Sequence, residues 1–405
     1  MSRPPEIRTE ALERRLQDQQ KQRGRAERAR GARGRASPLW LALDLYLPVV
    51  RSYRPRTGED RPSDDRVSLP PGVFRFGLPI LLILAGCARP AEGPASPEQS
   101  PTSSVSEPAT QMQESTGTIP GWQLGAHMPT ARSEMPAAEI AGVIYVPGGF
   151  SGLLGTGQFE GYVIRQDSWR ELRSMPAARH HLMAAAHNGM LYVFGGSSAV
   201  GFNATSNAWR YDPETDTWEE LPPMPEERMS GAAVTLGDTI YLMGGVGGSQ
   251  LMLAFDPDHL RWRSLPGPQQ PREHTAAVSY QGELWAIGGR WSGIGELSSV
   301  DIFNPQSGAW RSGPSIQIPR GGFAAATVGD RIFAAGGEVI MTGRDSLASL
   351  EIYDPETDAW EAGPNLPFAV HGVDGVGFDQ RFLLFGGSDR AAGIDNEGRV
   401  QIYAP

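Results

Sequence analysis

The sequence predicts an all-β fold in which six blades of four short strands close into a six-bladed β-propeller. The chain of 405 residues contains 50 glycines and 34 prolines, which favour turns and short strands over helices. A glycine doublet recurs six times, at intervals of 44 to 50 residues, and a tryptophan precedes every doublet by 26 residues. The doublets begin at Gly148, Gly195, Gly244, Gly288, Gly336 and Gly386, and the tryptophans are Trp122, Trp169, Trp218, Trp262, Trp310 and Trp360.

The repeating unit is clearest in its fifth copy, where four short strands, named a to d, are predicted. A tight turn at Gly329-Asp330 separates two apolar strands, and the second of these runs into Gly336. A loop of variable length and a third strand follow. Asp354-Pro355 then supplies the residues favoured in a type I turn before the strand that carries Trp360. The doublet lets the backbone leave strand b in conformations that other residues avoid.

This pattern resembles the kelch repeat, whose copies form propeller blades. The resemblance covers Ile119 to Pro405, about 70% of the chain. The two ends of this region predict how the ring closes. Val400 to Tyr403 matches strand c of a blade without a strand d, and Ile119 to Gly125 matches a strand d without its partners. Their pairing in one blade would remove the open sheet edges.

The first 118 residues are not predicted to contribute to the propeller. Residues 1–72 carry 16 basic against 10 acidic side chains and too few apolar residues for a core, so they are predicted to be a disordered basic leader. Residues 88–118, rich in Pro, Ser, Glu and Thr, are predicted to be a flexible linker. Residues 88–405 carry 19 basic against 36 acidic side chains, which argues against nucleic-acid binding.

Residues 73–87 have the organisation of a signal peptide. Arg75 precedes a short apolar run that ends in Leu84-Ala85-Gly86-Cys87, and Cys87 is the only cysteine of the chain. The segment resembles the lipobox of bacterial lipoproteins, and that resemblance implies a lipid attached to Cys87 and a place in the bacterial cell envelope. Because a signal peptide lies near an N-terminus, we expect translation to start at Val67 or Val73, which would leave the leader untranslated. The alternative is that translation starts at Met1 and the same apolar segment acts as an internal signal.

The face of the propeller that carries the b–c and d–a loops is the predicted binding face, because the b–c loops vary in length. An arginine lies 16 residues before five of the six doublets, at the start of strand a. Two interpretations stay open: these arginines bind an anionic ligand at the channel mouth, or they bond loop carbonyls as part of the framework. The predicted ligand-binding residues are Arg132, Arg179, Arg228, Arg272, Arg320, Arg290 and Trp291.

Metal and enzyme chemistry are less favoured by the sequence. Four histidines near the same face, His180, His181, His274 and His371, fall in different blades without local ligand spacing, so no metal site and no cofactor are predicted. The copper oxidases built on kelch propellers need a cysteine crosslinked to a tyrosine, whereas the one cysteine of this chain lies in the signal segment. Glu273 or Glu338 could serve as an acid or base, although no catalytic motif surrounds them.

The function predicted from the sequence is therefore binding rather than catalysis. We expect a lipid-anchored monomer that recognises an acidic protein or carbohydrate partner through the arginine-bearing face. The alternative is a sugar-acid mutarotase of the kind that acts on sialic acid, since such enzymes are also six-bladed kelch proteins.

Overall fold

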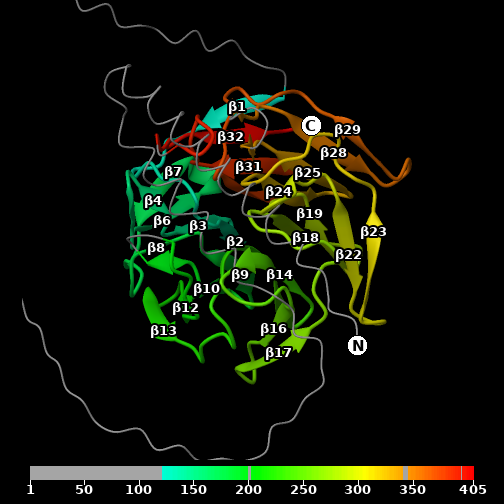
Figure 1. The fold of residues 1–405 in the computed structure, drawn as a ribbon. Helices are drawn as coiled ribbons and strands as arrows, with labels where there is room; N and C mark the ends of the chain where they lie inside the picture. The colour runs from blue at the N-terminus through cyan, green and yellow to red at the C-terminus, as the bar shows by residue number, and fades with distance from the viewer. Residues whose placement is uncertain (1–120, 199–201, 341–344, 394) are drawn as a thin grey trace, which may run out of the picture. The chain divides into compact units, whose positions relative to one another are not determined.

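A computed structural model of the protein describes residues 121–198, 202–340, 345–393 and 395–405. These residues form six four-stranded antiparallel sheets, arranged as blades around a central axis (Figure 1). The innermost strands contact one another in the ring order β2, β9, β14, β18, β24, β30 and back to β2. The predicted six-bladed β-propeller is confirmed.

The four strands of each blade follow one another from the channel outward. Blades 1 to 3 are β2 (Ala138–Ile140), β3 (Val143–Pro147), β6 (Phe159–Val163) and β7 (Ser168–Glu171); β9 (Met183–His187), β10 (Met190–Phe194), β12 (Ala208–Asp212) and β13 (Thr217–Glu220); β14 (Met229–Leu236), β15 (Thr239–Val246), β16 (Met252–Asp256) and β17 (Arg261–Leu265). Blades 4 to 6 are β18 (Ala276–Tyr280), β19 (Glu283–Ile287), β22 (Val300–Asn304) and β23 (Ala309–Gly313); β24 (Ala324–Val328), β25 (Arg331–Ala335), β28 (Leu350–Asp354) and β29 (Ala359–Ala362); β30 (Asp374–Phe378), β31 (Arg381–Phe385), β32 (Val400–Tyr403) and β1 (Trp122–Gly125).

Short two-stranded elements extend several loops on the binding face predicted from the sequence. They are β4 (Phe150–Ser151) with β5 (Leu154–Gly155), β8 (Arg179–His180) with β11 (Ser197–Ser198), β20 (Arg290–Trp291) with β21 (Gly295–Glu296), and β26 (Glu338–Val339) with β27 (Asp345–Ser346). A 3-10 turn spans Ile164–Gln166. No helix in the described part of the chain is long and apolar enough to cross a membrane.

The two ends of the described chain meet in the sixth blade. Strand β1 pairs antiparallel with β32, with Trp122 opposite Tyr403 and Gly125 opposite Val400. The pairing gives the last sheet its fourth strand, as the sequence predicts, so that all six described blades have four strands.

The hydrophobic core lies between the blades. Six apolar clusters fill the spaces between neighbouring blades, one cluster for each interface. The repeated tryptophans connect the same interfaces, because each indole N–H donates to a backbone carbonyl just beyond strand d of the blade before it. The acceptors, in the order of the tryptophans along the chain, are the carbonyls of Pro364, Ala126, Arg173, Pro222, Pro266 and Pro314.

The glycine doublets end strand b in a backbone conformation that excludes other residues. Both glycines of every doublet have positive φ. A Cβ at Gly195 would lie 2.1 Å from the Arg228 carbonyl oxygen, which no side chain could tolerate. The doublet therefore brings the end of strand b against the start of strand a in the next blade.

The leader, the signal segment with Cys87 and the linker lie outside the described residues, as do the first two residues of the predicted propeller region.

Candidate functional site at the channel mouth

The repeated arginines belong to the wall of the propeller. Arg132, Arg228, Arg272 and Arg320 have exposed fractions of 0 to 1%. In each of them Nη1 donates to the carbonyl oxygen of the first glycine of its own blade's doublet, over 2.6 to 2.9 Å. Nη2 pairs with a carboxylate: Glu160, Glu226, Asp301 and Glu351 in the order of the arginines along the chain.

Arg272 shows how completely the N–H donors of such a guanidinium are engaged in hydrogen bonds. Its Nη1 donates to three backbone carbonyls, its Nε donates to the Gln270 carbonyl, and its Nη2 lies 2.6 Å from Asp301 Oδ2. A guanidinium engaged in this way has no donor to offer a ligand at the channel mouth. The ligand-binding prediction is therefore corrected for Arg132, Arg228, Arg272 and Arg320, which act in the framework interpretation that the sequence left open.

Arg179 departs from this pattern. It is half-buried, and its Nη2 donates to the side-chain oxygen of Asn207 over 3.0 Å, whereas the other four arginines pair with a carboxylate. Its guanidinium lies over the Trp209 ring, 5.8 Å from the ring centroid. Burial lowers the pKa of Arg179. Its Nε, like that of Arg228, is buried without a hydrogen-bond partner among the described residues. Because Arg179 bonds an amide oxygen where Arg228 bonds the Glu226 carboxylate, it is held less firmly than the other four arginines.

Arg290 and Trp291 lie on the b–c loop of blade 4, and both are half-buried. Arg290 bridges two blades: its Nε donates to Glu273 over 2.7 Å and its Nη1 donates to Glu338. Its Nη2 also lies 3.1 Å from His274 Nε2. The two carboxylates that the sequence offered as acid or base are thus tied by one guanidinium beside the channel.

A ring of six residues, called the mouth ring below, encircles the channel where the innermost strands begin. Its members lie two positions after the repeated arginine position of each blade: Glu134, His181, Ser230, His274, Gly322 and Gly372. Each backbone N–H donates to the carbonyl of the ring member in the preceding blade, so six hydrogen bonds of 2.7 to 3.0 Å close a circle. All six residues have positive φ.

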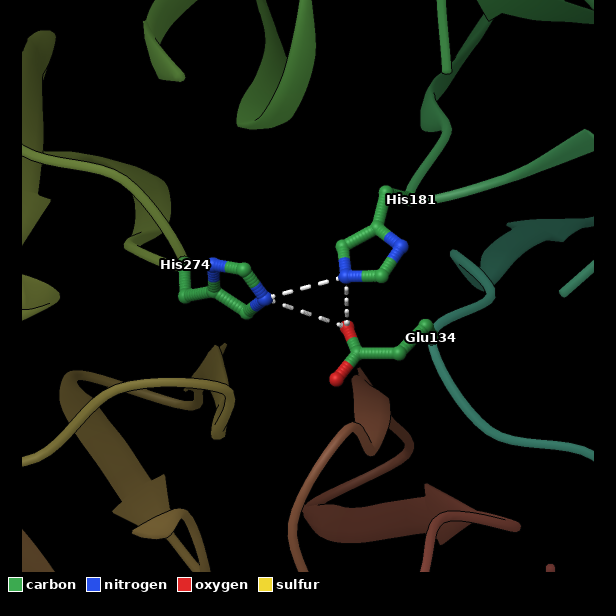
Figure 2. A group of neighbouring side chains, drawn as sticks. All are labelled: Glu134, His181 and His274. Atoms are coloured by element: carbon green, nitrogen blue, oxygen red, sulfur yellow. Dashed lines mark hydrogen bonds and ion pairs between the residues drawn. The ribbon is translucent and has the colours of Figure 1, made fainter. Parts of the chain in front are cut away.

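Three side chains of the mouth ring converge on one another (Figure 2). His181 Nε2 lies 3.5 Å from Glu134 Oε2, His274 Nε2 lies 3.7 Å from the same oxygen, and the two imidazole nitrogens are 3.1 Å apart. Both imidazoles are buried, with exposed fractions of 6 and 7%, and Glu134 is nearly so. Behind them, Glu273 contacts His274 Nδ1, and His180 contacts His181 Nδ1.

The charges of this cluster shift the pKa values of its members. Burial opposes ionisation of Glu273, but His274 and Arg290 outweigh it and lower the pKa of Glu273 to about 2. Burial and Arg290 oppose protonation of His274, whereas Glu273 and Glu134 outweigh them and raise its pKa. Burial, together with the neighbouring His274, lowers the pKa of His181. The pKa values of two histidines in contact are thereby shifted in opposite directions.

A cavity of about 110 Å³ lies in the channel and is lined by all six members of the mouth ring. Asp374 also lines it, and its carboxylate accepts hydrogen bonds from the backbone N–H groups of Ala137 and Gly375. Burial raises the pKa of Asp374 to about 6. A cavity of this volume has room for an ion with a few waters.

Exposed large apolar side chains are concentrated on the loops of the same face. Seven large apolar side chains are exposed among the described residues, and six of them lie on b–c or d–a loops. The six are Leu153, Leu154, Phe202, Leu251, Ile294 and Ile318, which are called the apolar rim below. Leu124, on the outermost strand of blade 6, is the exception.

The sequence pointed to the histidines of this site but not to Glu134 or the mouth ring. The histidines lie in different blades, which hides any ligand spacing between them along the chain. Their common offset from the arginine position was a usable signal, since Glu134, His181, Ser230 and His274 occupy the place where blades 5 and 6 have glycine.

The Kelch motif family model matches residues 178–225, 271–317 and 319–367. These residues of the chain therefore contain kelch motifs. A stretch of 62 residues is also similar to Kelch repeat and BTB domain-containing protein 13, at 42% identity for the Homo sapiens protein and 39% for the Mus musculus protein. Each alignment covers 14% of this chain and 14% of the relative, so the chain spans only a small part of those proteins.

The solved structure of YjhT resembles this kelch propeller, with a TM-score of 0.60. The match covers 68% of this chain and 95% of that one. At 17% sequence identity the likeness shows the fold alone.

Proposed function

We propose that this kelch propeller binds a protein partner through the face that carries the b–c and d–a loops. The observation that carries the proposal is the apolar rim, because an exposed apolar patch concentrated on one face of a soluble domain is typical of a protein-binding surface. The rim residues lie on the b–c loops of blades 1 to 4 and on the d–a loop that leads into blade 5, and Trp291 lies on the loop that also carries Ile294. Kelch propellers in general support protein–protein interaction, which agrees with this proposal.

The kind of partner proposed differs from the sequence prediction. The sequence favours an acidic ligand because it places five arginines at the mouth, but four of them are buried in ion pairs. A partner that offers apolar side chains fits the rim better. The mutarotase alternative relied on the same arginines to bind a sugar carboxylate, and the comparisons give it no support.

The proposal keeps the lipid anchor predicted at Cys87, which would hold the propeller at the surface of a bacterial membrane. Its support is the sequence of residues 73–87 alone. Replacing Cys87→Ser should move the protein from the membrane fraction to the soluble fraction or block its processing. Normal processing and retention in the membrane would contradict the anchor without affecting the binding proposal.

The binding face is tested by changing the rim without changing the fold. Leu153→Asp and Ile294→Asp introduce charges at side chains that are 73% and 59% exposed, so the melting temperature should stay within about 2 °C. Used as bait on envelope extracts, the wild type should capture a protein that both variants lose. Leu124→Asp, at 38% exposure on the outer edge, is the matched control and should retain it. Capture of the same proteins by all four baits would overturn the proposal.

A further inference from the structure

We propose that Glu134, His181 and His274 bind one divalent transition-metal ion, with Zn²⁺ as the representative, at the channel mouth. This inference is independent of the protein-binding proposal and departs from the sequence, which predicted no metal site. Two imidazole nitrogens and a carboxylate oxygen are donors that zinc prefers. The three atoms come from blades 1, 2 and 4, so only the closed propeller assembles them.

The distances between the donor atoms fit a single ion. Zinc bonds of about 2.0–2.2 Å in tetrahedral geometry separate neighbouring donors by about 3.4 Å. The three donor atoms of the mouth ring are 3.1, 3.5 and 3.7 Å apart. An ion at their centre would therefore need only small side-chain adjustments. With three protein donors, the fourth position stays open to water or to a ligand from the cavity.

The groups behind the donors orient them as in established metal sites. Glu273 contacts His274 Nδ1, which places the proton on Nδ1 and leaves the lone pair of Nε2 toward the other donors. Arg290 Nε holds Glu273 from the far side at 2.7 Å. His180 contacts Nδ1 of His181, so Nε2 of that imidazole also faces the centre. Metal binding would displace the contact of Arg290 Nη2 with His274, and the two carboxylate contacts of Arg290 would remain.

The charge around the centre favours a divalent cation. Glu134, Glu273 and Glu338 supply three carboxylates, and among the described residues Arg290 forms ion pairs with two of them and supplies one permanent positive charge. With neutral imidazoles the sum is −2, because three negative charges stand against one positive charge. A divalent ion would neutralise this net charge.

The backbone supports a role beyond folding for these side chains. Glu134, His181 and His274 have φ of 54°, 55° and 48°, a conformation that costs a non-glycine residue about 1 kcal/mol or more. Glycine occupies the equivalent positions in blades 5 and 6 and makes the same ring hydrogen bonds. Ser230, the ring member between the two histidines, has a buried hydroxyl without a partner among the described residues.

The experiment is a calorimetric titration of the purified full-length chain, freed of metal with a chelator, with ZnCl₂. The proposal predicts one ion per chain. Glu134→Gln, His181→Gly and His274→Gly should each weaken binding by about 100-fold or more. Glu273→Gln, which removes the orienting carboxylate, should weaken it by about 10- to 100-fold. The glycine variants match the residues of blades 5 and 6, so they should still fold.

The matched control is His259→Ala, which removes an exposed histidine on the c–d turn of blade 3 and should bind zinc like the wild type. Co²⁺ bound to the wild type should give visible ligand-field absorption bands that the His181→Gly protein lacks. The proposal is overturned if the wild type shows no saturable binding, or if the ring variants bind within about threefold of it.

Discussion

The wall position, which carries the repeated arginine, and the mouth-ring position lie two residues apart in every blade, yet they differ in what the blades have in common there. The wall position repeats its residue in five of six blades, and four of these arginines repeat the same contact with a doublet carbonyl. The ring position repeats its backbone conformation and its hydrogen bond, while its side chain changes among Glu, His, Ser and Gly. In this propeller a repeated side chain marks the framework. A changing side chain on a repeated backbone marks the place where a ligand can be bound.

The largest expected loss of unfolding free energy comes from removing a buried arginine of the wall position. Arg272→Ala leaves Asp301 buried without its partner, and breaking a buried ion pair in this way costs about 3–5 kcal/mol of unfolding free energy. Arg179→Ala removes a half-buried arginine that has Asn207 in place of a carboxylate, so about 1 kcal/mol is expected. Urea unfolding of both variants measures the contrast. Equal losses would show that the wall does not depend on the paired charge.

Removing a contact that closes the ring should cause the next largest loss of unfolding free energy. Trp122 is 4% exposed and donates to the Pro364 carbonyl, so Trp122→Ala should cost about 3 kcal/mol through the cavity and the lost hydrogen bond. Leu124→Ala, two residues along the same strand, should change stability by less than about 0.5 kcal/mol. If Trp122→Ala melts like the wild type, the pairing of the two chain ends does not stabilise the fold.

A smaller, pH-dependent effect is expected at Asp374, which lines the cavity below the ring. Its pKa is raised to about 6, so the folded protein keeps the proton to a higher pH than the unfolded chain does. The free energy of unfolding should therefore fall as the pH rises from about 4 to about 7. The side chain is half-buried and faces the channel, so about 1–2 kcal/mol is expected after screening by channel water.

The Asp374→Asn protein provides the reference for this effect, because its side chain does not titrate. Unfolding measured at about pH 4.5 and about pH 7.5 should show the wild type losing stability relative to the variant at the higher pH. Parallel pH profiles for the two proteins would contradict the assignment.

The sequence predicted the blades and their closure because the tryptophan and doublet positions are fixed by local backbone chemistry that every copy repeats. The sequence could not decide whether the repeated arginines bind a ligand or belong to the framework. The arginines donate to carbonyls whose positions depend on the positive φ of the doublet. The carboxylates that pair with the arginines lie on strand c or in the d–a loop. The variable b–c loops change the spacing to Asp301 and its equivalents. Glu134 was not predicted because the residue at its position changes among Glu, His, Ser and Gly and therefore gives no constant repeat signal.

The central claim, that the mouth ring carries ligand chemistry and the wall carries the fold, is tested most directly by one measurement. The unfolding free energies of the wild type and His274→Gly are compared with and without zinc. Zinc at about 100 times its dissociation constant should stabilise the wild type by about 2.7 kcal/mol and leave His274→Gly unchanged. Without zinc, the variant should lie within about 1 kcal/mol of the wild type. Equal stabilisation of both proteins by zinc, or none of either, would contradict the account.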